Sequence, residues 1–163
     1  MSLLSAGIIA AGEGSRFKQS GIRVHKPMIP IAGVPLIART IRNFQSAGVR
    51  KIVLIFNEAE GECVEWLRRE FPDFQFEFIV KSTRSSFESF WLVGQKLGPG
   101  RHLISTVDSF CFPEELNKMV EAGKAAGDGV YLGVTSFVDD EKPLWVNMDS
   151  RSSRITELGG NSG

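Results

Sequence analysis

Hydrophobic and polar positions follow one another along the chain in a pattern that predicts strands separated by helices. Apolar runs of strand length lie at residues Leu4 to Ala10, Lys51 to Phe56, Phe74 to Val80, His102 to Val107 and Gly129 to Thr135. Between these runs, apolar residues recur at the spacing of one helical face. Strands that alternate with helices imply right-handed crossovers and a mostly parallel sheet.

Residues that favour helix ends support the same division. Pro35 suits the first position of one helix, and Gly48 suits the left-handed residue that ends it. Ser85 and Glu88 have the spacing of a capping box, and Pro113 suits the start of a further helix. We therefore expect helices after the first, third and fourth strands, and a helical pattern stopped by Pro72 after the second.

Aromatic residues in the helix that Ser85 begins have helical spacing. Phe87, Phe90 and Trp91 recur at intervals of three and four residues. A base-stacking platform is one interpretation, but this spacing favours packing against the hydrophobic core. We predict that they are buried.

The C-terminal part differs in character from the rest. From Asp139 onward the apolar pattern weakens, with short candidate strands at Trp145 to Met148 and Arg154 to Leu158. The chain then stops at a glycine-rich stretch that begins at Gly159. We expect residues 1–163 to form a single domain whose C-terminal part is incomplete.

Composition narrows the class of protein. The chain has 163 residues, 42% hydrophobic and 23% charged, which is typical of one soluble domain. Lysine plus arginine equals aspartate plus glutamate at 19 each, so no overall field attracts a nucleic acid. Cys63 and Cys111 lack metal-ligand spacing, and no apolar stretch is long enough for a bilayer. We expect a cytoplasmic protein with no nucleic-acid or membrane partner. A homo-oligomer is compatible with this composition.

A glycine-rich turn follows the first predicted strand. In open parallel sheets, ligands bind beyond the carboxyl ends of the strands. The segment from Ala10 to Phe17 places Gly12, Gly14 and Arg16 at such an end, where backbone N–H groups can face phosphate oxygens. The turn predicts a phosphate-binding loop.

The two commonest phosphate loops do not fit this turn. A dinucleotide fingerprint that begins at Gly12 needs glycine where Phe17 stands, which disfavours an NAD-dependent oxidoreductase. A Walker loop that begins at Gly7 needs lysine where Glu13 stands, which disfavours a standard ATPase or GTPase.

The ordered set that remains is A-A-G-x-G-x-R, then nine residues, then Lys26-Pro27 and a Gly-x-Pro-Leu segment that leads into a helix. This set resembles the sugar-phosphate nucleotidyltransferase family over residues Gly7 to Ile41. The resemblance implies an α/β protein with a three-layer α/β/α, Rossmann-like nucleotide-diphospho-sugar transferase fold and a mostly parallel mixed sheet. Its members join the nucleotide of a nucleoside triphosphate to a phosphorylated small molecule, which implies those two partners.

The resemblance also implies roles for individual residues. The backbone at Ala10, Ala11 and Gly12 would contact the nucleotide, and Gly14 would let the loop fold over its phosphates. Arg16 would bind the leaving pyrophosphate, a task suited to a permanently charged planar fork.

Further positions match the family's site at other strand ends. Lys26 would neutralise the α-phosphate and the incoming phosphate. Ser85 and Ser86 would contact the base and sugar, although capping of a helix explains them as well. Asp108 ends an apolar strand where relatives carry a ligand of Mg²⁺, the implied cofactor. The acceptor would be a sugar 1-phosphate.

Departures from the family pattern leave alternatives open. We take Thr156 to Gly159 as the nearest match to the family's Glu-Lys-Pro element, and this segment lacks the lysine. A late second aspartate is not apparent. A helix similar to Ser85 to Leu92 occurs in choline-phosphate cytidylyltransferases, so an alcohol phosphate such as phosphocholine is an alternative acceptor. A non-catalytic nucleotide-binding regulatory domain is the other alternative.

Overall fold

The computed structural model describes residues 4–12, 24–125, 127–137 and 144–159. The chain divides into two compact units, residues 1–121 and 122–163. The expectation of a single domain stays a prediction. Within the described ranges, no helix combines the length and apolar character needed to cross a membrane.

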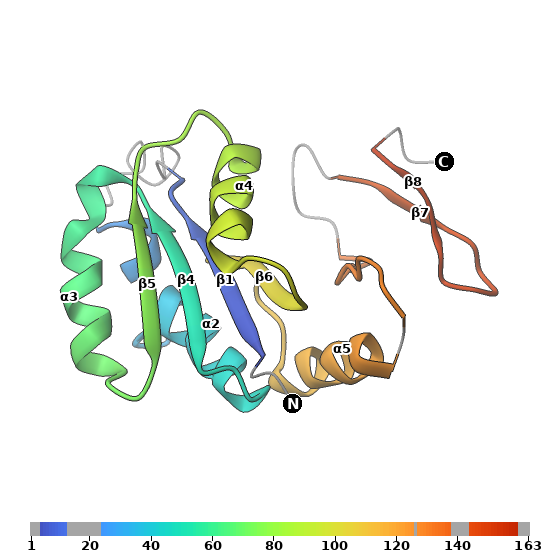
Figure 1. Ribbon diagram of the computed structural model, residues 1–163, viewed down its shortest axis with the longest axis horizontal. Coiled ribbons are helices and arrows are strands. Elements are labelled where there is room, and N and C mark those ends of the chain that lie inside the picture. Colours follow the sequence, from blue (N-terminus) through green and yellow to red (C-terminus); the bar gives the residue numbers. More distant parts are fainter. Residues whose placement is uncertain (1–3, 13–23, 126, 138–143, 160–163) are drawn as a thin grey trace. The chain divides into compact units, whose positions relative to one another are not determined.

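A parallel four-stranded sheet forms the centre of the first unit, in the order β5-β4-β1-β6 (Figure 1). Its strands are β1 (Ser5–Ala10), β4 (Lys51–Phe56), β5 (Gln75–Val80) and β6 (His102–Thr106). These ranges confirm four of the five predicted strands to within a residue at each end. The alternating strands and helices place the chain in the α/β class, as predicted.

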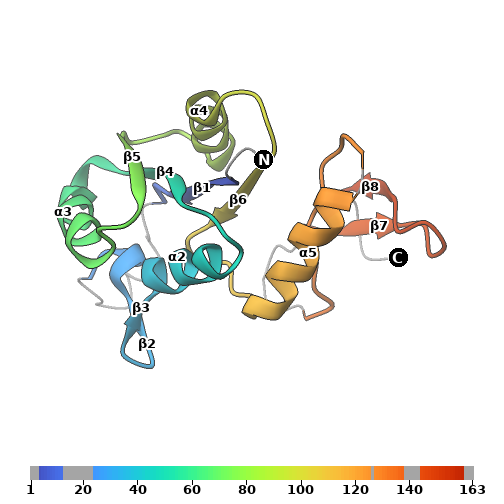
Figure 2. The same ribbon diagram turned by 60° about the horizontal axis from the view of Figure 1, so that its bottom comes forward.

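Helices cover both faces of this sheet. Ile52, Leu54 and Phe56 of β4 belong to one core cluster together with α2 (Leu36–Ser46) and α3 (Gly61–Glu70). Val53 and Ile55 point to the opposite face and belong to a second cluster with α4 (Ser86–Leu97). Figure 2 shows α2 and α3 on one side of the strands and α4 on the other. The result is the expected three-layer arrangement.

The helix ends agree with the local sequence signals. Pro35 takes the N-cap position of α2, one residue before the first helical residue, and not the first helical position that was predicted for it. Gly48 has φ 85° after the C-terminus of the helix. Ser85 caps α4, and α5 (Pro113–Ala125) begins at the predicted proline. The shorter elements are η1 (Lys26–Met28), β2 (Pro30–Ile31), β3 (Val34–Pro35) and η2 (Glu58–Glu60).

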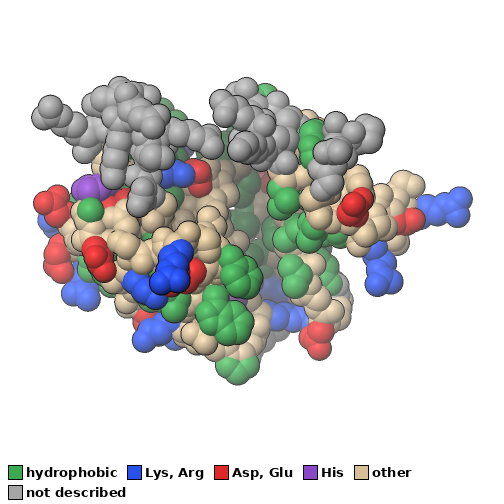
Figure 3. Space-filling view, turned by 90° about the horizontal axis from the view of Figure 1, so that it is seen from above, with side chains coloured by type: hydrophobic (Ala, Val, Ile, Leu, Met, Phe, Trp, Pro, Cys, Tyr) green, Lys and Arg blue, Asp and Glu red, His purple; other side chains and the backbone are tan. Residues whose placement is uncertain are grey.

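The aromatic residues of α4 contradict their prediction. Phe87 is 72% exposed and Trp91 56% exposed, and Phe90 is exposed as well. The helix instead turns Ser89 and Val93 to the sheet, where Val93 and Leu97 lie next to Gly7 of β1. Figure 3 shows hydrophobic side chains open on the surface where α4 lies.

The second unit contains a short antiparallel hairpin of β7 (Val146–Met148) and β8 (Ile155–Leu158), close to the weak strands predicted there. The strand predicted at Gly129 to Thr135 is wrong, because this segment has no strand structure. Val130 is 85% exposed. An apolar run forms a strand only where a neighbouring strand accepts its backbone hydrogen bonds, and the described structure pairs none with this segment.

Candidate active site

Polar or glycine residues follow three strands of the parallel sheet at one edge. Gly12 follows β1, Lys81 follows β5 and Asp108 follows β6. In the sheet register, Ile9 lies opposite Thr106, and the ends of β1, β4 and β5 are level. The three positions therefore share the carboxyl edge of the sheet, the side where ligands bind in this architecture. Figure 3 views the protein from the side toward which β1, β4 and β5 run in Figure 1.

Two residues predicted for the site, 82 positions apart in the chain, are in direct contact. The Nζ atom of Lys26 donates a hydrogen bond to Oδ2 of Asp108 at 2.6 Å. The lysine side chain is 21% exposed, whereas the aspartate side chain is 48% exposed. The carboxylate therefore keeps an open side on which a ligand can approach.

The backbone on each side of this ion pair is anchored. In η1, the N–H of Met28 donates to the carbonyl of His25, and the N–H of Ile29 donates to the carbonyl of Lys26. Pro27, the next residue, is buried. These contacts fix the origin of the lysine side chain.

The loop after β6 is anchored by β1 and by α2. The N–H of Val107 donates to the carbonyl of Ile9, and the hydroxyl of Thr40 donates to the carbonyl of Val107 at 3.3 Å. Further along, the amide of Asn43 donates to the carbonyl of Cys111 at 2.9 Å. The loop that carries Asp108 is therefore held at both ends.

Electrostatics keep Asp108 ionised. Partial burial opposes the charge, but hydrogen bonds from Lys26 and Thr106, together with the lysine charge, hold the pKa of Asp108 below its ordinary value. The carboxylate is thus an anion at neutral pH and can accept a cation.

The glycine turn is described only at its beginning. Ala10 and Ala11 are 2% and 5% exposed, so the turn leaves the core at this point. Gly12 is exposed, and no described atom lies within 4 Å of the position that a Cβ would take. Gly14 and Arg16 lie outside the described residues.

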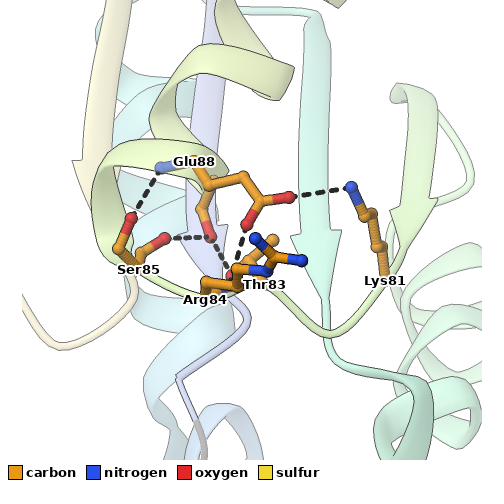
Figure 4. Close-up of polar contacts among 6 residues, drawn as sticks. Lys81, Thr83, Arg84, Ser85 and Glu88 are labelled. Carbon is orange, nitrogen blue, oxygen red and sulfur yellow. Dashed lines mark hydrogen bonds and ion pairs between the residues drawn. The ribbon is translucent and has the colours of Figure 1, made fainter.

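Ser85 and Ser86 lie at the N-terminus of α4, where Ser85 has a structural task. Its Oγ accepts a hydrogen bond from the N–H of Glu88 at 3.2 Å. The carboxylate of Glu88 accepts from the N–H of Arg84 and from Nζ of Lys81, both at 2.8 Å (Figure 4). The loop between β5 and α4 is therefore fixed by the first turn of the helix. Both serines are exposed beside it.

Lys81 was missed by the sequence analysis. It comes directly after β5, so the rule that selects Asp108 at the end of β6 also selects Lys81. Its charge is paired with Glu88. Applying the rule to every strand end would have found both residues.

The donor groups at Asp108 fit a Mg²⁺ ion that arrives with phosphates. Among the described residues, no group of three or more His, Cys, Asp or Glu side chains could hold a metal. Asp108 offers one ionised and half-exposed carboxylate. Magnesium binds oxygen and is often held by one or two carboxylates plus substrate phosphates, so this donor is sufficient only with a bound triphosphate.

The sequence also contains a Glu-Lys-Pro triplet, Glu141-Lys142-Pro143. This triplet matches the family's pattern better than Thr156 to Gly159, which lacks the lysine. The triplet lies outside the described residues. Glu157 instead accepts a hydrogen bond from the amide of Asn147 at 2.9 Å across the β7–β8 hairpin.

Comparison with protein families gives one match over almost the whole chain. The family described as "MobA-like NTP transferase domain" matches residues 6–160.

Curated relatives and solved structures agree with this match. The chain is 31% identical over 127 residues to 2-C-methyl-D-erythritol 4-phosphate cytidylyltransferase of Bacillus velezensis, covering 76% of this chain and 53% of that protein. It is 27% identical over 124 residues to CMP-5'-(3-aminopropyl)phosphonate synthase of Streptomyces rubellomurinus, covering 74% of this chain and 20% of that protein. The chain thus spans about a fifth to a half of the length of these relatives.

The fold is also that of solved nucleotidyltransferases. The inositol-1-phosphate CTP transferase from T. maritima superposes with a TM-score of 0.78 at 21% identity, covering 98% of this chain and 64% of that one. This likeness establishes the nucleotide-diphospho-sugar transferase fold expected from the sequence.

Proposed function

Since this chain belongs to the MobA-like NTP transferase family, we propose that it transfers the nucleotide of a nucleoside triphosphate to a phosphorylated small molecule and releases pyrophosphate. The observation that carries the proposal is the 2.6 Å contact between Lys26 and Asp108 at the carboxyl edge of the sheet. A cation and an anion meet there near the end of β1, where one could serve the phosphates and the other a metal ion.

In the proposed reaction, a phosphoryl oxygen of the acceptor attacks the α-phosphorus of the triphosphate in line. A new P–O bond forms on that phosphorus, and its bond to the bridging oxygen breaks. Pyrophosphate leaves with the bonding electron pair. The attacking oxygen is already anionic, so the reaction needs no general base, and the protein's task is to position two anions and screen their charge.

The residues of this chain divide that task. The ammonium of Lys26 offsets the charge of the α-phosphate and of the acceptor phosphate. Arg16 is assigned to the leaving pyrophosphate, and the amides from Ala10 to Gly12 to the nucleotide. Asp108 would hold Mg²⁺, which when bound supplies charge neutralisation on the phosphate oxygens.

The names of the two curated relatives described above favour CTP and an acceptor that is not a sugar 1-phosphate. These two are named for cytidine nucleotides, one with 2-C-methylerythritol 4-phosphate and the other with 3-aminopropylphosphonate. We therefore propose CTP and a phosphorylated alcohol or a phosphonate as the substrates. A sugar 1-phosphate is the competing acceptor class, supported by the resemblance of the Gly7 to Ile41 motif.

The proposal is tested by pyrophosphate release in the presence of Mg²⁺. The four common ribonucleoside triphosphates and dTTP are each paired with phosphocholine, 3-aminopropylphosphonate, 2-C-methylerythritol 4-phosphate and glucose 1-phosphate. We expect release with CTP and one non-sugar acceptor, and its loss in Asp108→Ala and Arg16→Ala.

The outcomes separate the candidate functions. Release only with glucose 1-phosphate would move the acceptor to the sugar class. Nucleotide binding without release from any pair would contradict a catalytic function and favour a regulatory nucleotide-binding domain.

A further inference from the structure

The ion pair between Lys26 and Asp108 uses two groups that the proposed reaction needs for other partners. The same carboxylate that would hold a divalent cation accepts a hydrogen bond from the lysine, through Oδ2 at 2.6 Å. The same ammonium is the one assigned to the phosphates. Without substrates, Lys26 therefore binds Asp108 where the cation would bind, and Asp108 binds Lys26 where the phosphates would bind.

We infer that Lys26 competes with the divalent cation for Asp108, so that the cation and the triphosphate bind cooperatively by an exchange of ion-pair partners. This inference rests on the proposed function for the identity of the triphosphate. The competition itself depends only on the contact between the two side chains.

The geometry brings the cation and the ammonium close together. Magnesium lies about 2.0–2.1 Å from its oxygen ligands, so a cation on Oδ2 would lie within about 5 Å of the ammonium, and a cation on Oδ1 somewhat farther away. The repulsion between a single and a double positive charge at that separation changes affinity by about tenfold even in bulk water, and by more in a partly covered site. The lysine must therefore move, or the cation binds weakly.

The anchored backbone limits which parts can move. The carbonyl of Lys26 accepts from Ile29 within η1, and Val107 is bonded to both β1 and α2. The exchange is thus a matter of side-chain torsions, chiefly in the flexible lysine. A triphosphate supplies the ammonium with new anionic partners and supplies the cation with further oxygen ligands, which removes both obstacles together.

The test measures Mn²⁺ binding to the nucleotide-free protein by electron paramagnetic resonance of free Mn²⁺, so that it requires no turnover. Lys26→Met keeps the length of the side chain and removes its charge. Lys51→Met is the matched control, because Lys51 forms a 2.7 Å ion pair with Glu77 at the opposite edge of the sheet and its loss changes the net charge equally. Thermal melting checks that each variant is folded.

We expect Lys26→Met to bind Mn²⁺ about tenfold more tightly than the parent, and Lys51→Met to bind it like the parent. Lys26→Gln, which also lacks the charge, must behave like Lys26→Met. Adding Asp108→Asn to Lys26→Met must abolish the gain. With CTP present, the gain must disappear, because the lysine then helps to bind the triphosphate.

Equal or weaker Mn²⁺ binding by both Lys26 variants, or no measurable binding to any of these proteins, would overturn the inference. The result is independent of the proposed reaction. A gain in Mn²⁺ affinity together with no turnover on any substrate pair would refute the reaction and leave the competition standing. Turnover by the parent without a gain in Mn²⁺ affinity in the Lys26 variants would support the reaction and refute the competition.

Discussion

Gly7 lies on β1 where α4 approaches the sheet, and replacing it with alanine should separate the two elements. An added Cβ would lie 2.4 Å from Cγ1 of Val93 and 3.3 Å from Cδ1 of Leu97, whereas ordinary contacts are 3.4–4 Å. Val93 is fully buried, and its β-branched side chain has essentially one rotamer in a helix. The helix must therefore withdraw by about 1 Å. Overpacking of this kind costs about 1–3 kcal/mol, so we expect Gly7→Ala to lose about 2 kcal/mol of unfolding free energy.

Urea denaturation followed by circular dichroism measures this loss, with an unchanged m-value expected for a two-state transition. Gly94 provides the matched control within α4, because no described atom lies within 4 Å of a Cβ built there. Gly94→Ala should stabilise the protein by up to about 1 kcal/mol, since alanine favours a helix more than glycine does.

A double substitution identifies the cause. Val93→Ala removes the methyl group that an added Cβ at Gly7 would meet, so the loss in Gly7→Ala plus Val93→Ala should be smaller than the sum of the single losses by about 1 kcal/mol. If Gly7→Ala stays within about 0.5 kcal/mol of the parent, or if the two losses add, the close approach of α4 to β1 is not what requires glycine.

Three further outcomes follow from burial, capping and charge. Burial raises the pKa of the Cys63 thiol to about 11, so at about pH 8 a thiol reagent should label exposed Cys111 and reach Cys63 only on unfolding, as peptide mass mapping would show. Ser85→Ala should lose about 1 kcal/mol of unfolding free energy in urea, because the N–H of Glu88 loses its acceptor, and Ser85→Asp should restore it. The lowered pKa of Asp108 stabilises the folded protein above its ordinary value of 3.8, and this contribution is lost as pH falls through the lower folded value. Asp108→Asn should therefore show a shallower loss of stability below about pH 4 in acid titrations followed by circular dichroism.

The strands of the central sheet were predictable because each carries a dense apolar signal. β4 is buried along nearly its whole length and reads as a continuous apolar run, as expected for a strand covered on both faces. The polar residues at the strand ends were predictable in part. Asp108 follows from the rule for parallel sheets, but its contact with Lys26 depends on the path of the chain through η1, which no local pattern specifies.

The errors arose where tertiary packing decides between two apolar faces. In α4, both the aromatic stripe and the face with Val93 have helical spacing, and the larger side chains gave the stronger signal. The face with Val93 is the one that packs next to Gly7 of β1, and this contact appears only in the folded structure. Likewise, the run from Gly129 to Thr135 has strand composition, but composition does not supply a pairing partner.

The most direct test of the account is the turnover of Lys26→Met and Asp108→Asn with the best substrate pair, measured as kcat beside the Lys51→Met control. Because the two groups are assigned to charge on the reacting phosphates, each variant should lose at least about 100-fold in kcat, while Lys51→Met should stay within about twofold of the parent. Turnover by Lys26→Met or Asp108→Asn within about tenfold of the parent would contradict the assignment of the reaction to this edge of the sheet.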